Sequence, residues 1–538
     1  MATSLTLLLV VGAVSLLVRV LRLGRRPANY PPGPPTVPIL GNIHLMPTHD
    51  AHKQFQKWAE EYGPVYSLIL GTKTLIVLSS AEAVKDLLDK RSAIYSDRPE
   101  MYIGQDLGSG GLRLLMMGYT PTWRSIRKLV HGLLNVTAAT RYLPYQMLEN
   151  RQMLYEILQK PDDIQHHIRR YANSLTTTMT FGWRTPSEND PQLRQLFHGF
   201  EEFTALAMTG TSAMLDSFPL LRRLPDVFLP TAAKARSLHK VERQLYVGHW
   251  LKAKNGLKDG TAHPSFSVDM AHFQEKEGFS DPLAGYTTGT LLEAGSGTTS
   301  DTLYAFVQAM ILFPDVQRKA QKEIDSVVGD NRLPVMEDYA NLSYIRGCIK
   351  ESLRWMPTTI LGAVPHAATQ DDHYMGYLIP KGAGVMNNVW AINMNADRYP
   401  KPREFNPDRY ADDAQSLFES ALNPDPSKRD NLTFGAGRRI CPGIHIAERS
   451  LFLGISRLLW AFHFEPALDP QTKKPIWPDP EKLTQGFDCG PIPFLTHITP
   501  RSEARAALVR EEWQEAQTFL DPVTKQWNEA ARREVIGM

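Results

Sequence analysis

Apolar residues recur at a spacing close to that of a helix through most of the chain, from about residue 90 to Phe313. The longest apolar-rich stretch, residues 283–313, ends where Pro314 follows, and as a helix it would extend about 45 Å. A second helix is predicted for residues 342–355, before Pro357. The pattern predicts a mainly α protein in which one helix is long enough to cross a domain.

Two short runs of β-favouring residues, 65–70 and 74–78, stand apart from this helical pattern. A turn that contains Gly71 separates them, so we expect a small antiparallel hairpin. Residues 82–90 then predict a helix.

The N-terminal segment is apolar and ends in positive charge. Residues 1–18 carry no charged side chain, and four arginines follow between positions 19 and 26. Because about 20 residues span a bilayer as a helix, the segment is long enough only if Arg19 snorkels. A cleaved signal peptide would place its positive charge before the apolar run, and a buried core helix would need no arginine flank. We expect residues 1–23 to be a single-pass membrane anchor, with the rest of the chain in the cytosol.

The two ends of the remaining chain differ from its middle. Residues 24–36 are basic and then rich in proline, which predicts a stiff, polyproline-like hinge. Residues 37–500 have the patterning of a globular domain. Residues 501–538 are charged and carry no recognisable chemistry, so we expect an appendage.

Charge and cysteine content exclude two classes of protein. The 538 residues contain 59 Lys and Arg against 57 Asp and Glu, and this balance argues against nucleic acid as a partner. Cys348, Cys441 and Cys489 are far apart and odd in number. They form no disulfide framework and fit a reducing compartment.

One of these cysteines lies in a glycine-rich turn, residues 434–443, beside arginines. Glycines such as Gly437 let a backbone bend and approach a bound group closely. A helix that starts near Pro442 would direct its positive end at the sulfur, and Arg439 would add a charge, so we expect a lowered thiol pKa and a thiolate. An axial thiolate on haem iron favours cleavage of the O–O bond.

Other interpretations of Cys441 are less specific. A lone cysteine is more often a small buried hydrophobe. Cys441 and His445 could face one metal ion, but zinc usually takes four such ligands, and no second Cys/His pair is nearby.

The ten residues 434–443 match the haem-binding loop of the cytochrome P-450 superfamily, Phe-x-x-Gly-x-Arg-x-Cys-x-Gly. By this resemblance Cys441 is the axial ligand of the iron, Phe434 packs beside the sulfur, Gly437 shapes the loop and Arg439 pairs with a haem propionate. Trp123, Arg127 and His366 resemble further propionate partners in the superfamily. A core tryptophan is the alternative for Trp123, and a satisfied loop histidine is the alternative for His366.

Glu351 and Arg354 lie three residues apart on one face of the second predicted helix. Alone, such a pair is worth well under about 1 kcal/mol. Together with Arg409, however, they resemble the superfamily's Glu-x-x-Arg helix and its Pro-x-Arg partner. The resemblance implies a buried charged network that supports the haem loop.

Residues 294–299, in the middle of the long predicted helix, read Ala-Gly-Ser-Gly-Thr-Thr. They resemble the superfamily's oxygen-activation motif, in which Thr298 would gate protonation, but Gly297 stands where an acid is expected. Glu293 and Asp301 lie four residues before and after Gly297, so either carboxylate could feed water into the space. A helix that is merely kinked by glycine is the alternative.

The resemblance runs from the anchor to about residue 500. It implies a mainly α helical prism around haem b with a small β-rich region. It also implies electrons from NADPH–cytochrome P-450 reductase and insertion of one atom of O₂ into a lipophilic small molecule. Arg124, Lys128 and Arg449 would form a basic docking surface for the reductase, unless they are simply a solvated face. The location implied is the endoplasmic reticulum membrane, with the catalytic domain cytosolic.

The substrate is expected to meet an apolar lining. The segments that correspond to the substrate-facing segments of the superfamily contain apolar side chains, namely Leu114, Leu115, Met116, Met117, Ile360, Leu361 and Phe487. The sequence most resembles filamentous-fungal members of secondary metabolism. Desaturation, dehydration or rearrangement by the same fold is one alternative, and a haem-bearing sensor without turnover is another.

Overall fold

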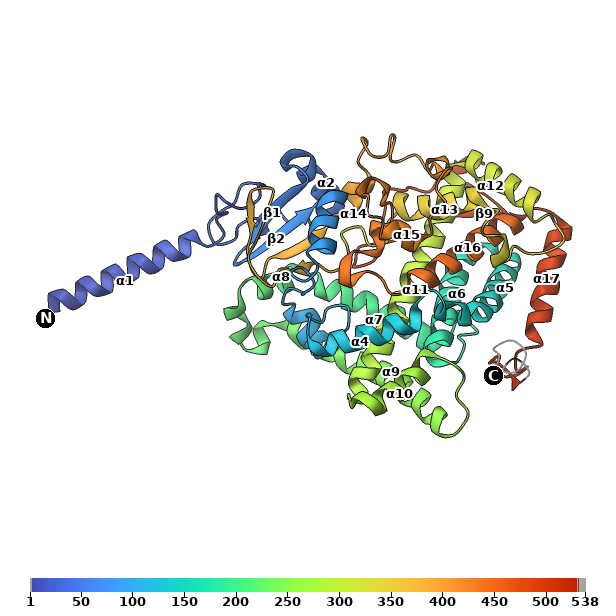
Figure 1. Ribbon diagram of the computed structural model, residues 1–538, viewed down its shortest axis with the longest axis horizontal. Helices are drawn as coiled ribbons and strands as arrows, with labels where there is room; N and C mark the ends of the chain where they lie inside the picture. Colours follow the sequence, from blue (N-terminus) through green and yellow to red (C-terminus); the bar gives the residue numbers. More distant parts are fainter. Residues whose placement is uncertain (1, 530, 532–538) are drawn as a thin grey trace.

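A computed structural model describes residues 2–529 and 531, and helices dominate it (Figure 1). The α-helices are α1 Ala2–Arg22, α2 Ala51–Tyr62, α3 Ala81–Val84, α4 Pro121–Leu134, α5 Leu143–Gln159, α6 Ile164–Phe181, α7 Pro191–Ala207, α8 Gly210–Ser217, α9 Pro230–Lys258, α10 Phe266–Glu277, α11 Asp281–Leu312, α12 Pro314–Val327, α13 Ser343–Trp355, α14 Val389–Asn393, α15 Leu417–Ala421, α16 Ile444–Ala461 and α17 Glu503–Gln517.

The strands are few and short, and they form small sheets. They are β1 Val65–Leu70, β2 Lys73–Leu78, β3 His366–Ala367, β4 Asp372–Tyr374, β5 Tyr377–Ile379, β6 Gly384–Asn387, β7 Phe462–Leu468, β8 Pro475–Ile476 and β9 Thr496–Pro500. The largest sheet has the order β1-β2-β6-β3, and it lies at the end of the molecule from which α1 projects (Figure 1). β1 and β2 pair antiparallel, so the predicted hairpin is confirmed.

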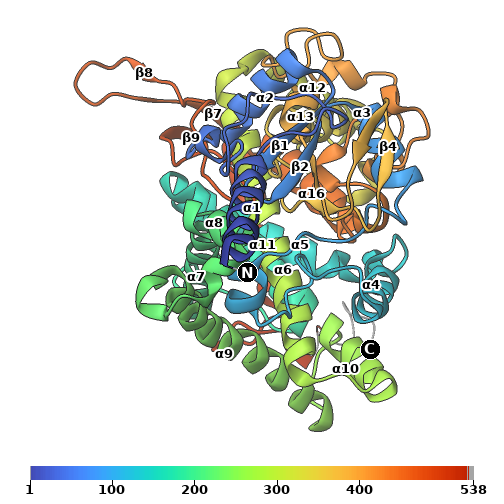
Figure 2. The same ribbon diagram turned by 90° about the vertical axis from the view of Figure 1, so that its left-hand side faces the viewer.

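α11 runs through the middle of the helical layer, where it packs against α6, α9 and α16 (Figure 2). Most of its side chains are buried, which explains its apolar sequence. The Ser280 hydroxyl caps its first turn, and α12 starts at Pro314. The predicted long helix is therefore confirmed, as is the helix predicted before Pro357, which is α13. Residues 81–90 are helical too, with a π-helical turn from Lys85 to Lys90.

α1 extends away from the globule (Figures 1 and 2). Among the residues that the structure describes, no helix combines the length and the hydropathy needed to cross a membrane. The predicted anchor, residues 1–23, includes residue 1 and the side chains of 2–8, 16 and 17, which lie outside the described part.

The predicted hinge is folded onto the sheet. The Arg26 guanidinium donates to the carbonyls of Gly33 (2.8 Å) and Pro34 (2.9 Å) and to the Ser67 carbonyl on β1 (2.9 Å). The Ser67 amide in turn donates to the Pro32 carbonyl (2.7 Å). Arg26 and residues 32–34 are thus bound to β1 and to one another.

The C-terminal segment makes contacts with the helical layer. α17 packs against α5, and Arg501 and Arg505 both pair with Asp325 of α12, at 2.6 and 2.7 Å. Farther along, the buried Trp527 ring lies 5.2 Å from the Tyr145 ring of α5. As far as residue 529 the segment is part of the globule, because its few apolar side chains are buried against the helical core.

Candidate functional site

The turn at residues 434–443 is held in place by a contact that only glycine permits. Gly437 has a positive φ of 59°, and a Cβ at this position would lie 1.9 Å from the Leu88 carbonyl oxygen. The Gly437 amide donates to the Asp89 carboxylate (2.5 Å), and the Cys441 amide donates to the Phe434 carbonyl (2.8 Å). The turn is thereby fixed against the π-helical residues 85–90.

α16 follows this turn and begins at Ile444, with Gly443 as its N-cap residue. The prediction that a helix begins near Pro442 is confirmed, with the first helical residue two positions later. The Gly443 amide still favours an anionic sulfur, since its hydrogen bond lowers the pKa of the Cys441 thiol.

The net electrostatic effect on that thiol is opposite to the predicted one. Burial raises the pKa of Cys441, and the Gly443 hydrogen bond and the Arg127 charge only oppose this rise. The cation that acts on the sulfur is therefore Arg127, whose guanidinium donates to the Ile440 carbonyl, and Arg439 has no such part. A bound metal cation would reverse the balance, because a coordinating thiol is deprotonated outright.

Arg439 contacts Trp123 and two backbone carbonyls. Its guanidinium stacks on the Trp123 ring, 3.8 Å from the centroid. It donates to the carbonyls of Ser96 (2.8 Å) and Met117 (2.7 Å). The structure thus brings Trp123, Arg127 and Arg439 together from α4 and the cysteine turn.

Arg98 joins this group, although no sequence motif marks it. It donates to the carbonyls of Leu115 (3.0 Å) and Pro365 (2.9 Å), and its charge acts on Arg439 and His366. Its segment has no helical periodicity, so only the fold reveals it. Within the described chain, Arg98, Arg127 and Arg439 form no ion pair, and burial lowers the pKa of each.

His366 is buried beside these guanidiniums. Its Nδ1 lies 2.7 Å from the Tyr95 carbonyl oxygen, so Nδ1 carries the proton and donates. Burial and Arg98 lower the pKa of His366 to about 3. The neutral ring thus presents Nε2 as an acceptor, whereas the predicted role as a donor to a propionate needs a second proton on the ring.

Glu351, Arg354 and Arg409 meet behind the cysteine turn. Arg354 donates twice to the Glu351 carboxylate, at 2.7 Å each, and both side chains are fully buried. Arg409 approaches the same carboxylate at 3.3 Å. Backbone bonds extend the support, since Thr433 of the turn region donates to the Leu353 carbonyl of α13 (3.1 Å). The network therefore connects α13 to the segment that leads into the turn.

On α11, the Thr298 hydroxyl donates to the Ala294 carbonyl (2.7 Å). Both carboxylate oxygens of Glu293 accept hydrogen bonds, one from Arg113 and one from the Tyr246 hydroxyl. Glu293 is therefore not free to direct water into the space beside Gly297. Asp301 instead faces a cavity that Gly297 also lines.

Comparison with known proteins agrees with this geometry. The cytochrome P-450 family profile matches residues 31–485. The chain belongs to the cytochrome P-450 family. It is 54% identical over 508 residues to the cytochrome P-450 monooxygenase virE of Hypocrea virens, covering 94% of this chain and 92% of that one. It is 50% identical over 521 residues to the monooxygenase fogE of Aspergillus ruber, covering 97% and 96%.

A solved structure supports the same fold. A zebrafish cytochrome P-450 structure with abiraterone covers 84% of this chain and all of its own, with a TM-score of 0.64 and 24% identity. This cytochrome P-450 is therefore a haem-dependent monooxygenase with the mainly helical fold of the family. Like other such monooxygenases, it uses O₂ and a redox partner and acts on a small molecule.

The residues present fit a haem. Cys441 provides one sulfur just before α16. The guanidiniums of Arg98, Arg127 and Arg439 donate to backbone carbonyls and form no ion pair among the described residues, although the charge of the Asp97 carboxylate acts on Arg98 and Arg439. Such a group suits the two propionates of a haem. When bound through the thiolate, haem supplies the activation of O₂. The chain itself would position the sulfur and neutralise the propionates, and it places Thr298 on α11.

We expect Cys441→Ala to abolish the strongly red-shifted Soret band of the reduced protein under carbon monoxide, because that shift requires an anionic sulfur opposite the gas. The matched control is Cys348→Ala, which removes a buried thiol on α13 and should keep the band. Absorption spectra of both purified variants decide the matter. A native spectrum from Cys441→Ala would contradict the assignment of the axial ligand.

We expect Glu351→Gln to lower the free energy of unfolding by about 3 kcal/mol, because it leaves the buried Arg354 charge uncompensated. Glu404→Gln is the control, since Glu404 makes an exposed pair with Lys401 (3.0 Å) that is worth about 0.5 kcal/mol or less. Denaturant unfolding of the haem-loaded proteins measures both. Equal losses would show that the buried network has no special weight.

Proposed function

We propose that this cytochrome P-450 uses haem b to insert one atom of O₂ into a lipophilic small molecule in fungal secondary-metabolite biosynthesis. The observation that carries the proposal is the convergence of the Cys441 turn with three guanidiniums that donate to backbone carbonyls and form no ion pair among the described residues. The fungal source of relatives at 47–54% identity supports the biological setting.

An apolar cluster near α11 supports a lipophilic substrate. Met116, Val364 and Phe487 are buried together with Phe203 of α7, and Leu115 packs partly buried against them. Met116, Leu115 and Phe487 belong to the lining expected from the sequence. Apolar surface stabilises an apolar ligand by about 25 cal/mol per Å² removed from water, so a ligand that contacts this cluster is favoured if it has a hydrocarbon skeleton.

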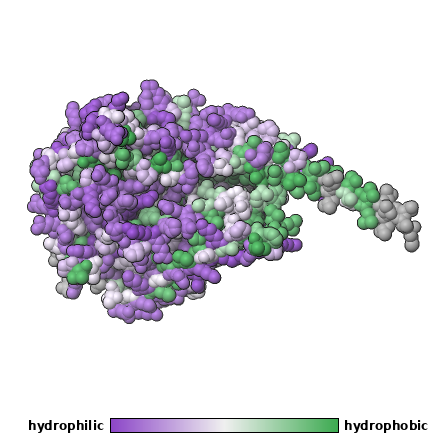
Figure 3. Space-filling model, turned by 180° about the vertical axis from the view of Figure 1, so that it is seen from behind, coloured by the Kyte–Doolittle hydropathy of each residue, from purple (hydrophilic) through white to green (hydrophobic). Residues whose placement is uncertain are grey.

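A second part of the proposal concerns the membrane. Exposed apolar side chains gather near the base of α1. One of them is Ile39, whose amide donates to the Leu23 carbonyl. Three others, Leu220, Val227 and Phe228, lie in the segment after Ser217, and the Ser217 carbonyl accepts a hydrogen bond from Thr72 in the β1–β2 turn. Figure 3 shows hydrophobic side chains along α1 and where it joins the globule. Together with the arginines that flank α1, this arrangement supports attachment to the endoplasmic reticulum membrane with the catalytic domain in the cytosol.

NADPH–cytochrome P-450 reductase is the proposed electron donor. Arg124 and Lys128 are exposed on α4, the helix that also carries Arg127 beside the Cys441 sulfur. Arg438 is exposed in the cysteine turn, and Arg449 lies on the following helix. A basic surface on the thiolate side suits an acidic flavoprotein.

Isotopically labelled O₂ tests the reaction. The chain is expressed with a fungal reductase, supplied with extracts of lipophilic metabolites, and its products are analysed by mass spectrometry. We expect one labelled oxygen atom per product and NADPH consumption that depends on the reductase. Unlabelled desaturated or rearranged products would contradict oxygen insertion, and the absence of NADPH consumption with any extract would favour a sensor.

We expect the double variant Arg124→Glu/Lys128→Glu to raise the KM for the reductase by about fivefold, because each lost surface charge contact is worth up to about 1 kcal/mol. Its chemically reduced spectrum under carbon monoxide should be unchanged. Lys473→Glu, on an exposed loop of the β7–β8 hairpin, is the control and should leave the KM as it is. Equal KM values in all three proteins would place the docking surface elsewhere.

A further inference from the structure

The acid that position 297 lacks is supplied from another part of the chain. A Cβ at Gly297 would lie 2.5 Å from the Oδ2 atom of Asp488, so the Asp488 carboxylate occupies the place that a side chain at 297 would take. Asp488 belongs to the loop after Thr484, more than a hundred residues from α11 in sequence. The missing side chain of the motif is thus replaced in space.

A second glycine makes room for a second carboxylate. Asp301 lies one turn after Gly297 on α11, and a Cβ at Gly490 would lie 2.8 Å from its Cγ atom. The loop is held in this position by two backbone bonds, from the Thr484 amide to the Gly490 carbonyl and from the Cys489 amide to the Thr358 carbonyl, at 2.8 Å each. Helix and loop are therefore fitted to each other around the two acids.

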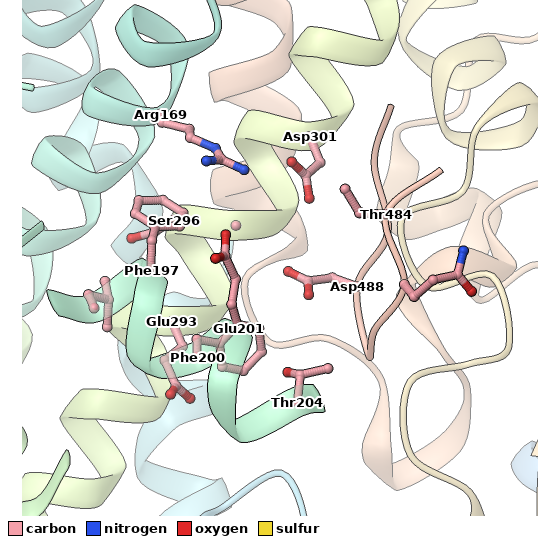
Figure 4. A pocket seen from close by; sticks show the side chains of 13 residues that line it. Arg169, Phe197, Phe200, Glu201, Thr204, Glu293, Ser296, Asp301, Thr484 and Asp488 are labelled. Carbon is pink, nitrogen blue, oxygen red and sulfur yellow. The ribbon is translucent and has the colours of Figure 1, made fainter. Parts of the chain in front are cut away.

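Both carboxylates face one cavity, which is shown in Figure 4. Asp301, Asp488, Arg169 of α6 and Glu201 of α7 all point into it. The volume of the cavity that is open to the centres of water molecules is about 80 Å³, so the cavity has room for several waters. Glu201 is solvent-exposed, so the cavity lies next to bulk water.

The pKa values of both acids are raised toward neutral pH. Burial, together with the negative charge of the other acid, raises the pKa of Asp301 to about 7, and burial raises the pKa of Asp488 to about 6. Glu201 pushes both values in the same direction, as Glu293 does for Asp488, and Arg169 opposes them. Neither carboxylate has a hydrogen bond or ion pair to another side chain in the described chain, so both remain available to water.

We propose that Asp488 and Asp301 form a proton relay that replaces the acid of the oxygen-activation motif and delivers protons to Thr298. This inference rests on the proposed monooxygenase function. The O–H bond of the Asp488 carboxyl breaks as its proton passes through water beside Gly297 to the Thr298 hydroxyl, which passes its own proton on. Asp301 then reprotonates Asp488, and solvent reprotonates Asp301 through the cavity. The electrons come from the redox partner.

A purely structural role for Asp488, in which it only fills the space at Gly297, makes different predictions. Asn has nearly the same shape as Asp and would fill the space equally well, but it holds no exchangeable acid proton. Moving the acid back to the helix, with Gly297→Asp and Asp488→Gly together, would preserve a relay and change the loop. These variants therefore separate proton supply from packing.

We expect Asp488→Asn to keep the native spectrum under carbon monoxide but to lower product per NADPH by tenfold or more, with the lost electrons recovered as hydrogen peroxide. The yield of native enzyme should fall as pH rises from about 6 to 7, where the acids lose their protons, and the variant should lack this dependence. The double variant should recover most of the yield. Asp479→Asn, an exposed acid before the loop, is the control.

A measurement independent of turnover completes the test. Infrared spectra of the carbon monoxide complex should show protonated carboxyl stretches that disappear between about pH 5 and 8, and Asp488→Asn should lose the part of this signal that belongs to Asp488. A native yield from Asp488→Asn, or a titrating band that survives this substitution unchanged, overturns the relay. If the native enzyme makes no labelled product, the proposed function fails, while the infrared titration still decides whether Asp488 carries the proton.

Discussion

The close approach of Gly437 to the Leu88 carbonyl is the constraint on which the rest of the site depends. It fixes the Cys441 turn against residues 85–90, and so it fixes the direction of the sulfur. The buried pair of Glu351 and Arg354 holds the other side of the same segment. Because both supports are rigid, the sulfur has one position relative to α11, which carries the distal residues.

Charge is distributed unevenly around this turn. Behind it, Glu351 is shared by two arginines and the charges are compensated. In front of it, Arg98, Arg127 and Arg439 are gathered with only backbone carbonyls as acceptors. Placing like charges together costs free energy, which a dianionic ligand offsets. The protein and its cofactor are therefore complementary in charge as well as in shape.

Periodicity and proline positions were enough to predict α11, α13 and the hairpin, because these features are local. The turn motif and the spacing of Glu351 and Arg354 likewise led to groups that the fold brings together. Burial is not local, which is why the direction of the Cys441 pKa was predicted wrongly and why the contacts that both terminal segments make with the globule were not predicted. Arg98 and Asp488 carry no motif at all, since their roles arise only when distant segments meet.

Phe487 and Asp488 are neighbours in one loop, yet their side chains contact different parts of the protein. The ring of Phe487 belongs to the apolar cluster that we propose faces the substrate, and the carboxylate of Asp488 fills the space beside Gly297. A ligand that displaces the backbone at Phe487 would also shift the acid, because a single peptide unit joins the two residues. Molecules of poor fit would then waste reducing equivalents, and selection for a new substrate in this lineage would act on both residues at once.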